Sequence, residues 1–118
     1  MTDRNSTEAY AKYAAKLLRV FNSLKARYGI EFDEILIFFA LGGLNFDQGQ
    51  GKPMFVKPAN IVSLSDFLVI PRETLRRKLL RLEEKDLVQR TSYGFVIKDM
   101  NVWRRLGELM QQTADVDA

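Results

Sequence analysis

The sequence predicts a mainly α-helical domain that spans residues 1–118 and carries one small β-hairpin. Apolar residues recur at three- and four-residue steps along most of the chain, which is the period of amphipathic helices. Around Gly94 the period becomes that of extended strands, and this glycine lies where a hairpin turn is expected. Pro71 marks the start of a helix, because a missing N–H does no harm in a first helical turn. A hydrophobic content of 47% suits one soluble domain of this length.

The chain contains no cysteine and no histidine, and this excludes several kinds of chemistry. Disulfides, thiolate nucleophiles, zinc-finger sites and histidine-based catalysis all require one of these residues. The glycines at 42–43 and 49–51 lack the flanking residues of a phosphate-binding loop. We therefore expect a protein that is not an enzyme and that uses no cofactor or metal.

No part of the sequence predicts a membrane span or a secretory leader. The most apolar window, residues 35–41, is far shorter than the roughly 18 to 20 residues that a membrane helix needs. The first six residues are polar apart from Met1. We expect a cytoplasmic protein with no membrane partner.

Two helices are expected before the middle of the chain. The first spans 7–28 and ends at Gly29, a residue type that commonly caps helices. Its apolar stripe either packs against the domain or forms a homodimer interface, and the sequence leaves both open. The second helix spans 33–44, with Asp33 as its N-cap and a largely apolar surface that predicts burial. The stripe of the first helix consists of Tyr10, Tyr13, Ala14, Leu17, Phe21, Leu24 and Tyr28.

A polar loop and a short strand are expected to follow the second helix. Gly42-Gly43 weaken that helix, and residues 47–53 are rich in turn formers. Residues 54–57 are flanked by two prolines, which are tolerated at strand ends, and this predicts a small edge strand.

A pair of helices joined by a tight connection comes next. The shorter helix spans 59–68, and the longer one spans 71–85 with Pro71 in its first turn. Residues 69–70 connect them. The expected inward-facing residues are Ile61, Val62, Leu64, Phe67 and Leu68 on the first helix and Leu75, Leu79 and Leu82 on the second.

An extended hairpin and a last helix complete the pattern. Residues 88–91 and 95–98 read as two strands joined by 92–94. The last helix spans 101–112, with Val102, Trp103, Leu106, Leu109 and Met110 on one face. Two helices followed by a hairpin, with a small strand ahead of them, predict a winged helix-turn-helix over 59–98, flanked by N- and C-terminal helices.

The positive charge of the paired helices indicates a nucleic-acid partner. Residues 71–81 carry five cations and one anion, a local excess of +4. The whole chain is +3, so the remainder sums to about −1. A basic stripe confined to one helix is typical of a DNA reader, since the major groove admits a single helix.

Three residues near the start of the 71–85 helix are the candidates for reading bases. Arg72 and Arg77 suit guanine, because a guanidinium donates two hydrogen bonds to O6 and N7, and Glu73 can accept from cytosine. Thr74 suits a phosphate or a thymine methyl group, and Arg76 suits a phosphate. The other candidates for DNA contact are Arg81, Ser63 and Ser65 from the helices and Arg90, Thr91 and Tyr93 from the hairpin.

Each candidate also has an ordinary structural explanation. A charged helix face is most often simply solvated. Glu73 is a first-turn carboxylate that favours the helix dipole, and Arg76 is placed to form a surface ion pair with it. Tyr93 is also explained as a turn residue. The coincidence of basic charge, helix order and hairpin in one segment favours DNA binding.

The segment 71–79, Pro-Arg-Glu-Thr-Leu-Arg-Arg-Lys-Leu, resembles the recognition helix of the Crp/Fnr family of bacterial transcription regulators. The continuation through 82–88 and the hairpin is similar to GntR- and MarR-type winged helices, and the flanking helices resemble the MarR arrangement. The resemblance covers about 60–98 and implies base reading by Arg72, Glu73 and Arg77. The chain departs from the family pattern at Pro71, where a serine is usual, and at Val69, where a turn glycine is common. It has no room for a cyclic-nucleotide barrel, so effector sensing is not carried over.

These observations predict a small bacterial transcription regulator that binds double-stranded DNA as a homodimer. A second hypothesis is a winged helix that serves as a protein-interaction module in a replication, partition or secretion complex, since fold does not fix function. A third, compatible with the first, is a small-molecule pocket between the terminal helices and the central apolar helix.

Overall fold

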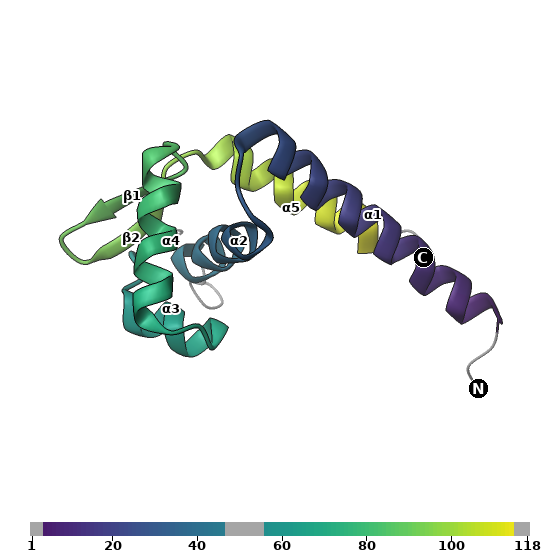
Figure 1. The fold of residues 1–118 in the computed structure, drawn as a ribbon, viewed down its shortest axis with the longest axis horizontal. Helices are drawn as coiled ribbons and strands as arrows, with labels where there is room; N and C mark the ends of the chain where they lie inside the picture. Colours follow the sequence, from purple (N-terminus) through teal and green to yellow (C-terminus); the bar gives the residue numbers. More distant parts are fainter. Residues whose placement is uncertain (1–3, 47–55, 115–118) are drawn as a thin grey trace.

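The computed structural model describes residues 4–46 and 56–114. Within these ranges the protein is mainly helical and carries one two-stranded antiparallel sheet (Figure 1), which confirms the predicted balance of structure. The elements, in order, are α1 (Arg4–Tyr28), α2 (Phe32–Phe46), α3 (Ile61–Leu68), α4 (Arg72–Glu84), β1 (Val88–Thr91), β2 (Gly94–Ile97) and α5 (Met100–Ala114).

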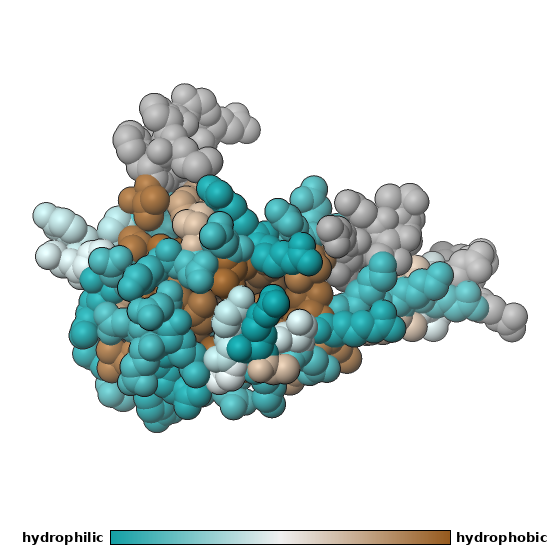
Figure 2. Space-filling model, turned by 90° about the horizontal axis from the view of Figure 1, so that it is seen from above, coloured by the Kyte–Doolittle hydropathy of each residue, from teal (hydrophilic) through white to brown (hydrophobic). Residues whose placement is uncertain are grey.

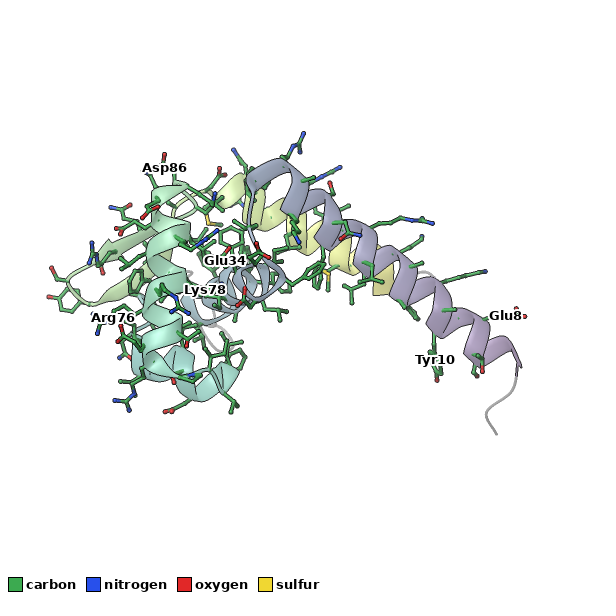
Figure 3. All side chains as sticks on the ribbon, viewed as in Figure 1. Glu8, Tyr10, Glu34, Arg76, Lys78 and Asp86 are labelled. Atoms are coloured by element: carbon green, nitrogen blue, oxygen red, sulfur yellow. The ribbon has the colours of Figure 1, made fainter. Side chains whose placement is uncertain are left out.

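The terminal helices α1 and α5 pack side by side and form an arm that projects from the rest of the molecule (Figure 1). The radius of gyration is 15.8 Å, against the roughly 13.5 Å expected of a compact domain with this number of residues. The arm accounts for this difference. Its outer part carries Tyr10, which is 64% exposed (Figure 3).

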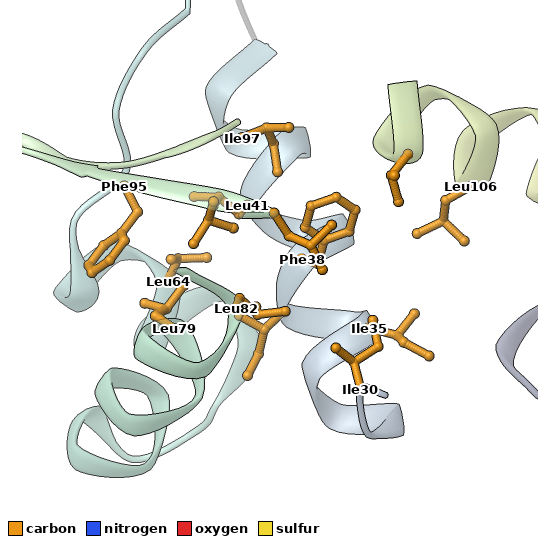
Figure 4. Packing of buried hydrophobic residues seen from close by; sticks show 14 of the residues in the cluster. Ile30, Ile35, Phe38, Leu41, Leu64, Leu79, Leu82, Phe95, Ile97 and Leu106 are labelled. Atoms are coloured by element: carbon orange, nitrogen blue, oxygen red, sulfur yellow. The ribbon is translucent and has the colours of Figure 1, made fainter. Parts of the chain in front are cut away.

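Helix α2 is the centre of the core, as its apolar sequence predicts. Ile35, Ile37, Phe38 and Leu41 are fully buried, and they meet side chains from α3, α4, β2 and α5 (Figure 4). The apolar run is therefore explained by packing on several sides of one helix.

Two expectations about the ends of α2 are wrong. Asp33 is not the N-cap: it lies in the first turn, and the carbonyl of Glu31 accepts the first helical hydrogen bond, from Ile35 at 3.0 Å. The helix also continues two residues past the expected end at Leu44, to Phe46. At Gly42 the indole of Trp103 occupies the space that a Cβ atom would need, so glycine allows α5 to approach closely.

Helix α3 begins two residues later than expected and buries less of its surface. Asn60 is its N-cap, and the side-chain oxygen accepts a hydrogen bond from the N–H of Ser63 at 2.8 Å. Of the expected inward residues, Leu64 is buried, whereas Val62 and Phe67 are 44% and 62% exposed. The outer face of α3 is therefore apolar and open.

The hairpin has the predicted position and a regular register. Val88 pairs with Ile97 and Thr91 with Gly94. The edge strand expected at 54–57 is not found: Met54 and Phe55 lie outside the described residues, and the following two residues are not in a strand. The chain instead meets the sheet at Ala59, which forms an isolated bridge to Phe95, because both N–H groups donate to the partner carbonyls at 3.0 and 2.8 Å.

Helix α5 has the predicted face, with Val102 and Leu106 buried and Trp103 packed on Phe39 and Phe46. Within the described ranges, none of the helices combines the length and the apolar character that crossing a membrane would require.

Candidate nucleic-acid interface

The candidate site is built on α4, whose two sides differ sharply. Leu75, Leu79 and Leu82 are fully buried against α2 and α3. Steps of four and three residues place these leucines on one side of the helix. Glu73, Arg76 and Arg77 lie away from the leucine side, and Arg72, in the first turn, is exposed as well.

The start of α4 is fixed by its first residues. Pro71 lies at the N-cap rather than inside the first turn, and its carbonyl accepts a hydrogen bond from the N–H of Leu75 at 2.9 Å. The proline side chain has no hydrogen-bond acceptor, so the helix starts without a side-chain cap. Thr74 is half-buried beside the exposed group of charges.

The turn between α3 and α4 is held by Ser65. Its backbone carbonyl accepts hydrogen bonds from the N–H groups of Val69 and Ile70, and its hydroxyl donates to the carbonyl of Ile70 at 2.6 Å. Ser65 is one of the predicted DNA contacts, and its hydroxyl donates within the turn. Ser63 is exposed in the first turn of α3 and is accessible to a partner.

Val69 adopts the left-handed conformation, with φ 56° and ψ 46°. In the families whose recognition helix resembles residues 71–79, glycine is common at this position. The backbone at Val69 has the left-handed shape that glycine favours. A left-handed conformation costs about 1–2 kcal/mol for a residue with a Cβ atom, and β-branching adds to the crowding. The chain therefore stores strain directly before the helix that would read DNA.

The exposed charges at the start of α4 are weakly paired. Arg76 and Glu73 lie 3.7 Å apart and both are well exposed, so this ion pair contributes little. Among the described side chains, residues 6–46 and 56–111, no carboxylate oxygen lies within 4.0 Å of the guanidinium of Arg72 or Arg77. These two arginines are available to an anionic partner.

Arg81 has a different environment from the one predicted. Its Nε atom lies 2.7 Å from Oε2 of Glu34, a carboxylate with no exposed surface. Lys78 lies 3.8 Å from the same oxygen and 3.3 Å from Oδ2 of Asp33 (Figure 3). The other oxygen of Glu34 accepts a hydrogen bond from the N–H of Glu31 at 2.8 Å. Arg81, one of the predicted DNA contacts, therefore takes part in an ion-pair network that ties α4 to α2, and its side chain stays 45% exposed.

The three hairpin candidates also differ in whether they have partners within the protein. Thr91 donates its hydroxyl to the carbonyl of Gly94 at 2.8 Å and accepts from the N–H of Tyr93 at 3.1 Å, which closes the turn. Arg90 lies 3.4 Å from Glu83, and both side chains reach solvent. Tyr93 is 83% exposed at the tip. Of the three hairpin candidates, Tyr93 is the one with no structural task.

Asn45 is a residue that the sequence reasoning missed. Its amide nitrogen donates to the carbonyls of Lys57 and Phe95, and its oxygen accepts from the N–H of Ile97 at 2.8 Å. One fully buried side chain thus fixes the hairpin to the end of α2. The one sequence signal for this role is that Asn45 is a single polar residue near the end of a largely apolar helix.

The distribution of charge along α1 was also missed. This helix contains six cations and one acid, whereas α4 contains five cations and three acids. The net charge of about −1 for the residues outside 71–81 concealed the positive charge of α1, because acidic residues elsewhere offset the α1 cations. Hydrophilic side chains follow the arm on the side seen in Figure 2.

No known protein family matches the chain, and no curated protein resembles it closely enough to be matched. The functional interpretation therefore depends on the geometry of the site itself.

Proposed function

We propose that the chain is a winged helix-turn-helix transcription regulator that binds double-stranded DNA sequence-specifically through α4. The observation that carries the proposal is that Arg72 and Arg77 are exposed and unpaired in the N-terminal half of a helix whose leucine face is fixed in the core. A helix in the major groove presents its N-terminal residues to base edges. Arginine is the residue best suited to guanine there.

The surroundings of α4 support this use. The strained turn at Val69 and the hydroxyl of Ser65 fix the angle between α3 and α4, and Asn45 fixes the hairpin. A rigid scaffold of this kind is what base reading needs, because hydrogen bonds to base edges depend on orientation. Tyr93 at the hairpin tip reaches beyond the body and would contact the sugar-phosphate backbone.

The proposed regulator acts as a homodimer through α1. Leu18, which is 53% exposed, lies on an outer face of the helix with Ala11 and Ala14, and small residues there allow another helix to approach. A two-fold dimer would place two copies of α4 about one helical turn of DNA apart. Sedimentation velocity of the protein and of Leu18→Glu tests this part: a monomeric wild-type protein would refute it.

The test of DNA binding is selection of bound duplexes from a random pool, followed by titrations of the selected duplex at several salt concentrations. Affinity should fall steeply as salt rises, because each phosphate contact releases counterions. The double variant Arg72→Glu/Arg77→Glu should fold and lose the selected duplex. Arg104→Glu, an exposed reversal on α5, is the matched control and should retain it. Failure of every duplex to bind at low salt would refute the proposal.

A second candidate function, a protein-interaction module, is favoured by the open apolar face of α3. Phe67 is 62% and Val69 87% exposed, next to the exposed Asp66. Exposed apolar clusters of this kind often mark partner surfaces. Phe67→Ser separates the two functions, since it should leave duplex affinity unchanged and abolish capture of a protein partner if this second function holds.

A further inference from the structure

We propose that the pocket between α1 and α5 is a binding site for a small organic carboxylate with an apolar body. The pocket has a volume of about 260 Å³ and lies wholly within the arm. Its lining contains no residue of α2, so it differs from the pocket that the sequence suggested between the terminal and central helices. It is also separate from the proposed DNA-reading surface on α4.

The floor of the pocket is apolar. Val20 and Leu24 of α1 and Val102 of α5 are buried in the core, and Leu109 of α5 packs against it. A ligand body that covers this floor removes apolar surface from water, which contributes about 25 cal/mol per Å². The floor therefore selects for a hydrocarbon or aromatic body.

The rim of the pocket is cationic and comes from both helices. Arg19 and Arg27 stand on α1, about 12 Å apart along the axis by the rise of an α-helix, and Arg105 faces them from α5. Among the described side chains, no carboxylate oxygen lies within 4.0 Å of the Arg19 or Arg27 guanidinium. Arg105 has an exposed intrahelical contact with Glu108 at 3.8 Å, which a tighter partner would replace at little cost.

The polar groups between these arginines complete the chemistry of the rim. Ser23 lies between Arg19 and Arg27 along the same face of α1, and Tyr28 lines the pocket at the end nearest the body. Both hydroxyls can donate to a carboxylate oxygen. Guanidinium groups bind carboxylates with two parallel hydrogen bonds, which fixes the orientation of the ligand head.

The size of the pocket limits the ligand. A dry apolar cavity of about 150 Å³ holds benzene. A volume of 260 Å³ therefore holds one ring or a chain of similar size together with a carboxylate head.

Charge argues for a small anion and against a second copy of the chain in this place. A two-fold contact through the pocket would set Arg19, Arg27 and Arg105 of one copy against the same residues of the other. Like charges in a desolvated contact oppose association. The face with Ala11, Ala14 and Leu18, on another side of α1, carries none of these three arginines, so dimerisation and ligand binding use different surfaces.

The experiment is a titration of the full-length protein with benzoate and with hexanoate, in which calorimetry and NMR amide chemical shifts detect binding. Benzamide and hexanamide test the carboxylate, and acetate tests the apolar body. We expect benzoate or hexanoate to shift amides of α1 and α5, and we expect acetate and the amides to bind at least tenfold more weakly. Arg27→Gln and Arg105→Gln should each weaken binding about tenfold, whereas Arg104→Gln should leave it unchanged.

The proposal is overturned if the acids and amides bind equally, if neither acid binds, or if the Arg104→Gln control weakens binding as much as the pocket variants. It is also overturned if Arg27→Gln and Arg105→Gln instead change the sedimentation coefficient, because the groove would then be an interface between copies. Far-UV circular dichroism and thermal melting verify that each variant folds. The titration needs no DNA, so its outcome is independent of the proposed function.

Discussion

The two halves of α4 carry the same kind of side chain in opposite environments. In the N-terminal half, Arg72 and Arg77 are exposed and have no carboxylate partner among the described side chains. In the C-terminal half, Lys78 and Arg81 surround the buried carboxylate of Glu34. The basic residues of α4 therefore do not form one continuous surface. Half of this run is available to a partner, and half holds the helix in place.

The difference between the halves follows from the helical period. Lys78 and Arg81 are three residues apart and so lie on a shared side that meets α2. Arg77 is one residue before Lys78 and is turned away by about 100°. The ion-pair network and the candidate reading surface thus use adjacent residues for separate purposes.

Arg81→Ala should produce the largest effect on stability. The substitution leaves the buried carboxylate of Glu34 with only Lys78, 3.8 Å away, as a cationic partner. Removing one member of a buried ion pair typically costs about 3–5 kcal/mol, and because Lys78 remains, we expect a loss of about 3 kcal/mol. Urea denaturation of the variant and of the wild-type protein measures this loss in the free energy of unfolding.

The matched control for this prediction is Arg77→Ala on the other half, which should change the free energy of unfolding by less than about 0.5 kcal/mol. Equal losses for the two variants would mean that the halves do not differ. The double variant Glu34→Leu/Arg81→Leu should recover much of the stability, since it removes both charges.

Arg77→Ala should have the larger effect on the selected duplex. A bidentate contact to guanine contributes about 1–3 kcal/mol of discrimination, so affinity should fall and preference at one base position should relax. Fluorescence anisotropy with the selected duplex and with single-base variants measures both quantities. If affinity falls equally for all sequences, Arg77 meets a phosphate and the base-reading assignment is wrong.

Arg76→Ala should have a smaller and more uniform effect. Its weak contact with Glu73 does not fix the guanidinium to a base edge, so we expect a phosphate contact. The slope of log affinity against log salt should decrease by about 1, with sequence preference unchanged. A change in preference at one position would place Arg76 with the base-reading residues.

The parts of the structure that the sequence predicted are those encoded by local patterns. The helices were found because each buries an apolar stripe, and the hairpin because Gly94 interrupts two alternating segments. Gly94 has φ 141°, and a Cβ atom there would lie 2.5 Å from the carbonyl oxygen of Ala59. Helix order and the position of the hairpin turn therefore required only near neighbours in the sequence, whereas the close approach of Ala59 to Gly94 did not show in the local pattern.

The parts that were missed depend on contacts between distant residues. Glu34 meets Arg81, and Asn45 meets Phe95 and Ile97, through side chains whose partners no local pattern identifies. The burial of Phe67 was overestimated for a related reason. Helical spacing places it near the apolar side of α3, but no element within residues 4–46 and 56–114 covers its side chain.

Val69→Gly should have the smallest effect, and its sign is informative. At Val69 the substitution relieves a left-handed conformation that costs about 1–2 kcal/mol, and it loses about 0.5–1 kcal/mol through the flexibility of glycine. We expect a gain of about 0.5 kcal/mol, visible as a small rise in melting temperature. The same substitution at Val62, inside α3 and likewise exposed, has no strain to relieve and should lower stability by about 0.5–1 kcal/mol.

The opposite signs at Val69 and Val62 would establish that the strain before α4 is real. Equal losses at both positions would mean that the turn holds Val69 without strain. If Val69→Gly also lowers affinity for the selected duplex while it raises stability, the strained turn orients Arg72 at the start of the reading half. Unchanged affinity would assign that orientation to Ser65 and the buried leucines of α4 alone.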